Sequence, residues 1–151
     1  MTDDPTDSSG EELHDLTARH EAERDLKAAR DLLDKFIQQS PVPTWISGPD
    51  GTMTVANRAL KETLHLTDEQ LIGRYNVLND RNLDEQGLMG QIRAVFDELR
   101  PAQIELTWSG GKVDGADLAA AKEIVIRATL FPIVDEDGEL KNVVCQWLDV
   151  S

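Results

Sequence analysis

The chain of 151 residues has a formal net charge of −14 and 40% hydrophobic residues, which suits one folded domain with a short segment outside it. The negative charge disfavours nucleic acids and anionic membranes as partners, because both present phosphate groups. The sequence has no apolar run of about 18 residues and no basic leader, and its one cysteine, Cys145, cannot form an internal disulfide. We therefore expect a cytoplasmic protein.

The first 39 residues predict a disordered lead-in followed by one long helix. Residues 1–10 are small, polar and acidic, which is typical of disorder. Residues 11–39 contain neither Gly nor Pro and predict a helix of roughly 43 Å, longer than a domain of this size covers.

Five residues of this helix follow steps of four and three along the chain: Ala22, Leu26, Ala29, Leu33 and Phe36. This spacing is typical of one seam of a coiled coil, so we expect a homodimer formed through Leu26, Ala29, Leu33 and Phe36. The alternative is an amphipathic helix that lies on its own domain.

The rest of the chain, residues 40–151, predicts short strands and helices. Pro41 and Pro43 end the long helix because neither supplies a backbone N–H. The expected elements are strands at 44–47 and 52–56 around an Asp-Gly turn, helices at 58–65 and 67–72, an irregular stretch at 75–86, a helix at 87–100, a strand at 103–109, a flexible loop at 110–122 with a helical turn at 117–121, and strands at 123–134 and 140–150. Antiparallel strands with helices gathered between them predict an α+β fold, a sheet covered on one face.

Particular strings, in this order, resemble the PAS domain, a small sensor module of histidine kinases, chemoreceptors and cyclic-dinucleotide enzymes. They are Asp50-Gly51 in the first hairpin, T-M-T-V-A-N-R-A-L at 52–60, L-T-D-E-Q-L-I-G-R at 66–74 and the final Asp149-Val150-Ser151. The resemblance covers about residues 36–151. It implies a PAS-like five-stranded antiparallel sheet with helices on one face over 40–151, preceded by an N-terminal cap helix at 11–39.

The resemblance also implies a signal-exit motif at Asp149 and Ser151. Ser151 stands where the family usually has threonine, and it keeps the hydroxyl group. We expect short side-chain hydrogen bonds here to set the direction of the following chain, which in the family leads to a signalling effector such as that of a two-component system.

The resemblance does not identify a cofactor, and two that the family uses are disfavoured. Flavin-binding members carry G-R-N-C, whereas Gly73-Arg74-Tyr75-Asn76 has Asn76 in place of the adduct-forming cysteine. Haem-binding members take a histidine from the long helix, here 87–100, which has none, so that His65 is the remaining candidate. The acidic turn at 135–139 is too short for a calcium-binding EF-hand, so we expect no metal site.

The ligand pocket that the resemblance implies lies between the sheet and the helices. Our candidates for its polar and aromatic lining are Tyr75, Asn76, Trp108 and Arg127. If Arg127 points inward it needs Glu105 or a ligand carboxylate as a partner, and if it points outward it is a surface arginine. Trp108 and Trp147 have core packing as the alternative role, and Cys145 that of a small buried hydrophobic residue.

Two functions from different classes remain open. The first is a non-enzymatic module that senses a small molecule or a partner and relays its state through the flanking helices. The second is a ligand-free dimerisation or protein-interaction module whose core is filled by its own side chains. An enzyme would need an acid–base pair or an activated nucleophile in the cavity, and we expect no catalytic residue because no such motif is present.

Overall fold

The structure is a computed structural model that describes residues 5–108, 111–113, 116–118 and 124–151. The chain divides into two compact units, residues 1–37 and residues 38–151, and each is described by itself. Side chains are described for residues 12–108 and 124–151.

The first unit consists of most of helix α1, Pro5–Gln39. The helix begins at Pro5, whereas the sequence predicted disorder through residue 10. Proline suits the first turn of a helix, where its missing N–H has no partner to lose, and acidic residues nearby favour that end of the helix dipole. Leu26 and Leu33 are each 59% exposed and Phe36 is 71% exposed. The seam is therefore open on a single chain, and the dimer stays a prediction.

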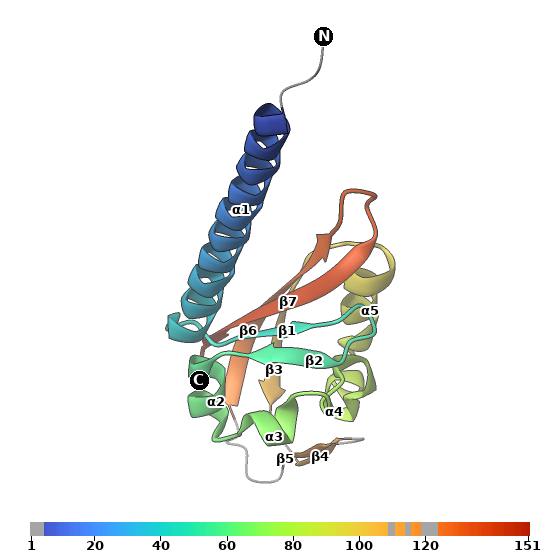
Figure 1. The fold of residues 1–151 in the computed structure, drawn as a ribbon. Helices are drawn as coiled ribbons and strands as arrows, with labels where there is room; N and C mark the ends of the chain where they lie inside the picture. Colours follow the sequence, from blue (N-terminus) through green and yellow to red (C-terminus); the bar gives the residue numbers. More distant parts are fainter. Residues whose placement is uncertain (1–4, 109–110, 114–115, 119–123) are drawn as a thin grey trace. The chain divides into compact units, whose positions relative to one another are not determined.

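The second unit contains the predicted five-stranded antiparallel sheet (Figure 1). Its strands are β1 (Thr44–Ser47), β2 (Met53–Ala56), β3 (Ala102–Trp108), β6 (Ile124–Val134) and β7 (Leu140–Asp149). They lie in the order β2-β1-β7-β6-β3, so the last strand of the chain occupies the centre of the sheet. The fold class predicted from the sequence is confirmed.

Alternation along the strands decides which face of the sheet is buried. In β3, Ile104, Leu106 and Trp108 are buried, while Glu105 and the other residues between them are exposed. Strand β6 repeats the pattern, because Ile126, Ala128 and Leu130 are each 1% exposed. Side chains of period two thus build one buried face and one open face.

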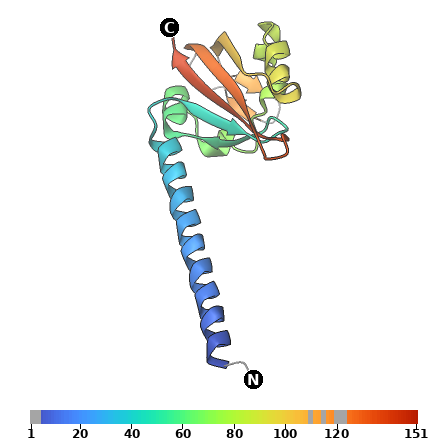
Figure 2. The same ribbon diagram turned by 90° about the horizontal axis from the view of Figure 1, so that it is seen from above.

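Short helices cover the buried face of the sheet (Figures 1 and 2). They are α2 (Arg58–Leu64), α3 (Asp68–Leu71), η1 (Val77–Asn79), α4 (Arg81–Glu85) and α5 (Met89–Asp97). Their fully buried residues, among them Leu60, Ile92 and Val95, pack against the inward side chains of the strands to form the core.

Two stretches differ from their predictions. The irregular stretch 75–86 contains the helices η1 and α4, because Asn76 and Asp80 act as helix caps rather than as turn residues. The stretch 110–122 contains an antiparallel pair, β4 (Gly111–Val113) and β5 (Ala116–Leu118), where the glycines suggested a loop. Residues 117–118 of the predicted helical turn are therefore strand, and its residues 119–121 lie outside the described residues.

Candidate functional site

The interior between sheet and helices is almost completely filled by side chains. It retains a cavity of about 20 Å³, and its lining includes Tyr75, Trp108, Cys145 and Trp147. A volume of this size holds about one water molecule. The residues present therefore do not fit a flavin or a haem, each of which is far larger than the cavity.

A buried hydrogen bond joins Tyr75 in the cavity wall to Asp80. The Tyr75 hydroxyl donates to Oδ2 of Asp80 over 2.6 Å, and the two residues are 4% and 0% exposed. The other carboxylate oxygen of Asp80 accepts from the Asn82 backbone N–H at 3.0 Å, which caps α4. The pair thus fastens helix α4 to the segment that leads into the core.

Burial controls the ionisation of Tyr75. Desolvation raises the pKa of Tyr75 well above its ordinary value, the negative charge of Asp80 and the hydrogen bond to it act in the same direction, and a side-chain hydrogen bond with Trp108 opposes them. The phenol is therefore neutral at physiological pH and acts as a donor. Sequence reasoning missed Asp80, although an aspartate directly before a polar helix is a signal for a cap.

Two tryptophans line the cavity from strands β3 and β7, which lie on either side of β6 in the sheet. The rings of Trp108 and Trp147 lie 6.1 Å apart between centroids and are tilted by 48°. The Trp147 backbone N–H donates to the Pro43 carbonyl at 2.9 Å, so this residue contacts both the cavity and the segment before β1.

Cys145 also lies in the cavity wall and is buried. Desolvation raises its thiol pKa to about 12, against a weaker opposing hydrogen bond with Trp147. Because the thiolate is the reactive form, the residue behaves as a small buried hydrophobic side chain at neutral pH.

Asn76 does not line the cavity, contrary to our expectation. Its Oδ1 accepts from the Leu78 backbone N–H at 2.9 Å, and its Nδ2 donates to the Asp50 carbonyl at 3.1 Å and to the Thr52 hydroxyl at 3.2 Å. The side chain therefore links the turn between β1 and β2 to helix η1. Its hydrogen bonds are used for structure rather than for a ligand in the interior.

Arg127 also lies away from the cavity, on the open face of the sheet. It stands directly opposite Glu105 on β3, with 3.6 Å between its Nη2 and the glutamate Oε2. Both side chains are about half exposed, so this is a surface ion pair. The outward alternative is the one that the strand alternation produces.

The last residues of the chain are hydrogen-bonded to the beginning of β6. Oδ1 of Asp149 accepts from the Ser151 backbone N–H at 2.9 Å, and the Ser151 hydroxyl accepts from the Val125 backbone N–H at 3.0 Å. The Val150 N–H donates to the Val125 carbonyl at 2.9 Å. The two polar residues of the expected exit motif are thus brought together at the end of β7.

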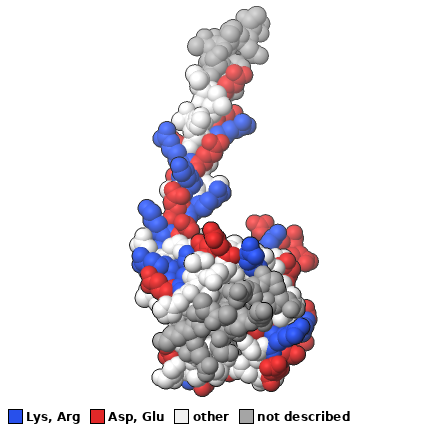
Figure 3. Space-filling view, turned by 90° about the horizontal axis from the view of Figure 1, so that it is seen from below, with Lys and Arg blue, Asp and Glu red and all other residues white. Residues whose placement is uncertain are grey.

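Three further observations concern surface charge, metal ligands and membrane-spanning helices. Acidic and basic side chains are interspersed along α1, as Figure 3 shows. Within the described ranges, no three residues of the metal-ligating types are placed to hold a metal ion. Nor does the part of the chain that the structure describes include a helix long and apolar enough to cross a bilayer.

An antiparallel five-stranded sheet with short helices over one face, a filled interior and a hydrogen-bonded last strand defines a small α+β domain. The PAS fold family model matches residues 31–150. The chain belongs to this family and is a sensory or signalling domain, so the resemblance seen in the sequence is confirmed. No curated protein matches the chain significantly.

Solved structures of the same fold are similar at low identity. The PAS domain of Bordetella pertussis BvgS is 20% identical, with a TM-score of 0.57 over 82% of this chain and 88% of that one. The PAS domain of an HTR-like protein from Haloarcula marismortui is 17% identical, with a TM-score of 0.60 over 87% and 99% of the two chains. A Rhodobacter sphaeroides LOV protein is 15% identical, with a TM-score of 0.61 over 81% and 68%. These likenesses show the fold.

Proposed function

We propose that the chain is a non-enzymatic signal-input module that relays the packing state of its interior to an effector through β7. The observation that carries this proposal is that one strand holds both the cavity wall and the exit. Cys145 and Trp147 line the cavity, and Asp149 lies two residues further along the same strand. A change in how Trp147 packs is therefore transmitted along a single backbone to the exit.

Hydrogen bonds of Trp147 and Val125 support a relay that reaches both the segment before β1 and the end of β7. The hydrogen bond from Trp147 to Pro43 couples β7 to the segment that follows α1, and the bonds from Val125 couple the exit to β6. A signal would favour one of two packings of the helices against the sheet, and each packing would place these two ends differently.

Dimerisation through α1 belongs to the same proposal. Leu26, Ala29, Leu33 and Phe36 follow a coiled-coil spacing, and on a single chain all four are exposed. The light-state dimer of the fungal blue-light photoreceptor Vivid, 17% identical with a TM-score of 0.55 over 72% of this chain and 78% of that one, is a dimer of this fold. A paired helix would carry the change in packing as a change in its supercoil or register.

A second function, a ligand-free interaction module, is favoured by the size of the cavity. About 20 Å³ is far below the roughly 300 to 1,000 Å³ of typical small-molecule pockets. In this case the domain would pair or recruit other chains with its core filled by its own side chains.

Fusion of the chain to a histidine-kinase effector tests the relay. We expect Trp147→Phe to change the autophosphorylation rate, because it alters the cavity wall without removing the strand. Gln146→Ala is the matched control, since Gln146 is the exposed neighbour on the same strand. A folded Trp147→Phe fusion that signals like the parent would refute the relay and favour the interaction module.

A further inference from the structure

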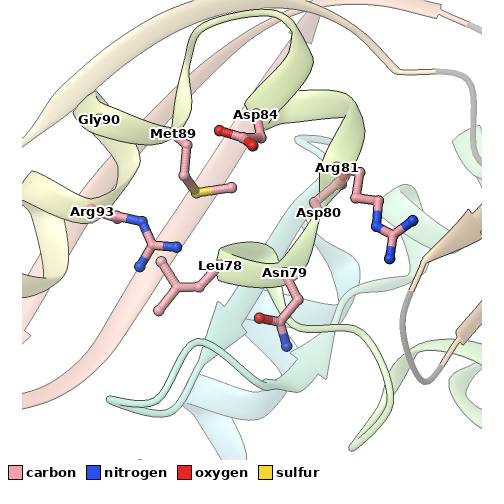
Figure 4. A pocket seen from close by; sticks show the side chains of 8 residues that line it. All are labelled: Leu78, Asn79, Asp80, Arg81, Asp84, Met89, Gly90 and Arg93. Atoms are coloured by element: carbon pink, nitrogen blue, oxygen red, sulfur yellow. The ribbon is translucent and has the colours of Figure 1, made fainter.

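A small molecule that this domain senses would bind outside the interior, which holds about one water molecule, and the surface has a polar cleft. The cleft lies between η1, α4 and the beginning of α5, and its volume is about 290 Å³ (Figure 4). That volume suits a small molecule of a few heavy atoms rather than a planar cofactor. The following inference rests on the proposed sensory function, because it names the ligand that such a sensor would take.

Opposite charges stand around an apolar surface in this cleft. Figure 4 shows Asp84 and Arg93 on either side of Met89, with Leu78 facing them. Among residues 12–108 and 124–151, neither the Asp84 carboxylate nor the Arg93 guanidinium has an ion-pair partner. Met89 is 7% exposed and belongs to the core, and Leu78 packs against that core.

The cleft is connected to the interior by Asp80. Asp80 lines the cleft, is fully buried and accepts the hydrogen bond of Tyr75, which in turn lines the interior cavity. A ligand in the cleft would contact Asp80, and Asp80 holds Tyr75 in the wall of the interior cavity. A ligand here needs no open interior to affect the packing of Tyr75 and Trp108.

We infer that the cleft binds a small zwitterion with an apolar body, an α-amino acid with an aliphatic side chain. The Arg93 guanidinium recognises the carboxylate by charge-assisted hydrogen bonds, and the Asp84 carboxylate recognises the ammonium group. The aliphatic side chain covers Met89 and Leu78. Both residues are exposed, so a ligand with one charge alone would pair with only one of them and leave the other to water.

Calorimetric titration of the full chain with L-leucine, L-isoleucine, L-valine and L-methionine tests this assignment. We expect at least one of them to bind and to raise the melting temperature, because a ligand that binds the folded state stabilises it. Isocaproate lacks the amine of leucine and isoamylamine lacks the carboxylate. We expect each analogue to bind about fivefold more weakly than leucine, as loss of one partly exposed charge pair implies.

Arg93→Gln and Asp84→Asn remove the two charges without changing side-chain length greatly. Each is expected to weaken binding about fivefold. Arg58→Gln and Glu62→Gln are matched controls, because Arg58 and Glu62 form an exposed ion pair on α2 outside the cleft. Both control variants should bind the amino acid like the parent.

Two results would overturn the inference: none of the four amino acids binds, or the cleft variants and the controls bind equally well while all remain folded. Neither result bears on the relay, which the Trp147→Phe kinase fusion tests separately. A relay that fails while amino acids bind as expected would instead refute the proposed function and leave the site intact.

Discussion

The Tyr75 hydroxyl and the Asp80 carboxylate form a 2.6 Å hydrogen bond in which both groups are shielded from water. We expect Tyr75→Phe to lower the free energy of unfolding by about 1–3 kcal/mol, because it leaves a buried carboxylate oxygen without its donor. Urea denaturation measures the change. Thr54→Val, an exposed edge-strand substitution, is the control and should cost less. An unchanged Tyr75→Phe midpoint would mean that water replaces the hydroxyl.

Gly51 and Gly73 both have positive φ angles, +91° and +72°, but differ in their surroundings. A Cβ at Gly51 would lie 2.6 Å from Oδ1 of Asn76, whereas a Cβ at Gly73 would meet nothing within 4 Å. Gly73→Ala should therefore cost about 1–2 kcal/mol for the left-handed backbone alone, and Gly51→Ala should cost more. Thermal denaturation of the pair measures the difference. Equal losses of stability in the two variants would show that the Asn76 side chain moves aside from the new Cβ without loss of free energy.

Leu33 and Leu32 are adjacent, exposed residues of α1, and only Leu33 belongs to the predicted seam. We expect Leu33→Asn to weaken dimerisation and Leu32→Asn to leave it unchanged, because a polar group on the seam disrupts the apolar contact between helices. Sedimentation equilibrium of both variants gives the dimer dissociation constants. Removal of residues 1–34 should leave a folded monomer, and a truncated chain that still forms dimers would refute the seam as the main interface.

Asp149→Ala removes the acceptor of the Ser151 N–H at the end of β7. The exposed position should limit the loss of stability to about 0.5–1 kcal/mol. In a histidine-kinase fusion, the same substitution should alter output, because the bond biases the direction of the outgoing chain. Denaturation and autophosphorylation are measured on one protein. Outright unfolding, or signalling like that of the parent, would contradict a role in coupling.

Cys145 should resist thiol reagents until the protein unfolds. Its folded pKa of about 12 is raised from the ordinary value of 9.0, so at pH 8 the folded thiol is neutral while a minor fraction of the unfolded thiol is already thiolate. As pH rises from 9 towards 12, the unfolded chain ionises first and stability is lost. We expect native protein at pH 8 to react far more slowly with a disulfide reagent than protein in guanidinium chloride. Equal rates would place Cys145 within reach of solvent.

Local chemistry was sufficient for much of the chain. Pro41 and Pro43 end the long helix wherever the chain folds, because the missing N–H is a property of the residue. Asn57 caps α2, with its Oδ1 accepting from the Leu60 N–H at 3.0 Å, and asparagine is a residue type that favours this position. The resemblance to the PAS domain, which rests on short strings of residues, implied the five-stranded antiparallel sheet.

Other features depended on which surfaces meet. Arg127 is an ordinary surface residue because the alternation of side chains along β6 points it to the open face of the sheet. One inserted residue in the strand would turn the same side chain to the buried face. The sequence carries a cap signal at Asp80, but only the fold shows that this carboxylate is fully buried and accepts a hydrogen bond from the Tyr75 hydroxyl on the other side of η1.

The sequence by itself determined a long helix and antiparallel strands, because helix breaks, caps and period-two patterns act over a few residues. The exit motif at Asp149 and Ser151 rests on the family resemblance and stays a prediction. Tertiary structure decided the size of the interior and placed Asn76 outside it. It also brought Asp84, Met89 and Arg93 together in one cleft. These properties depend on how side chains from separate elements share space, and no local pattern encodes that packing.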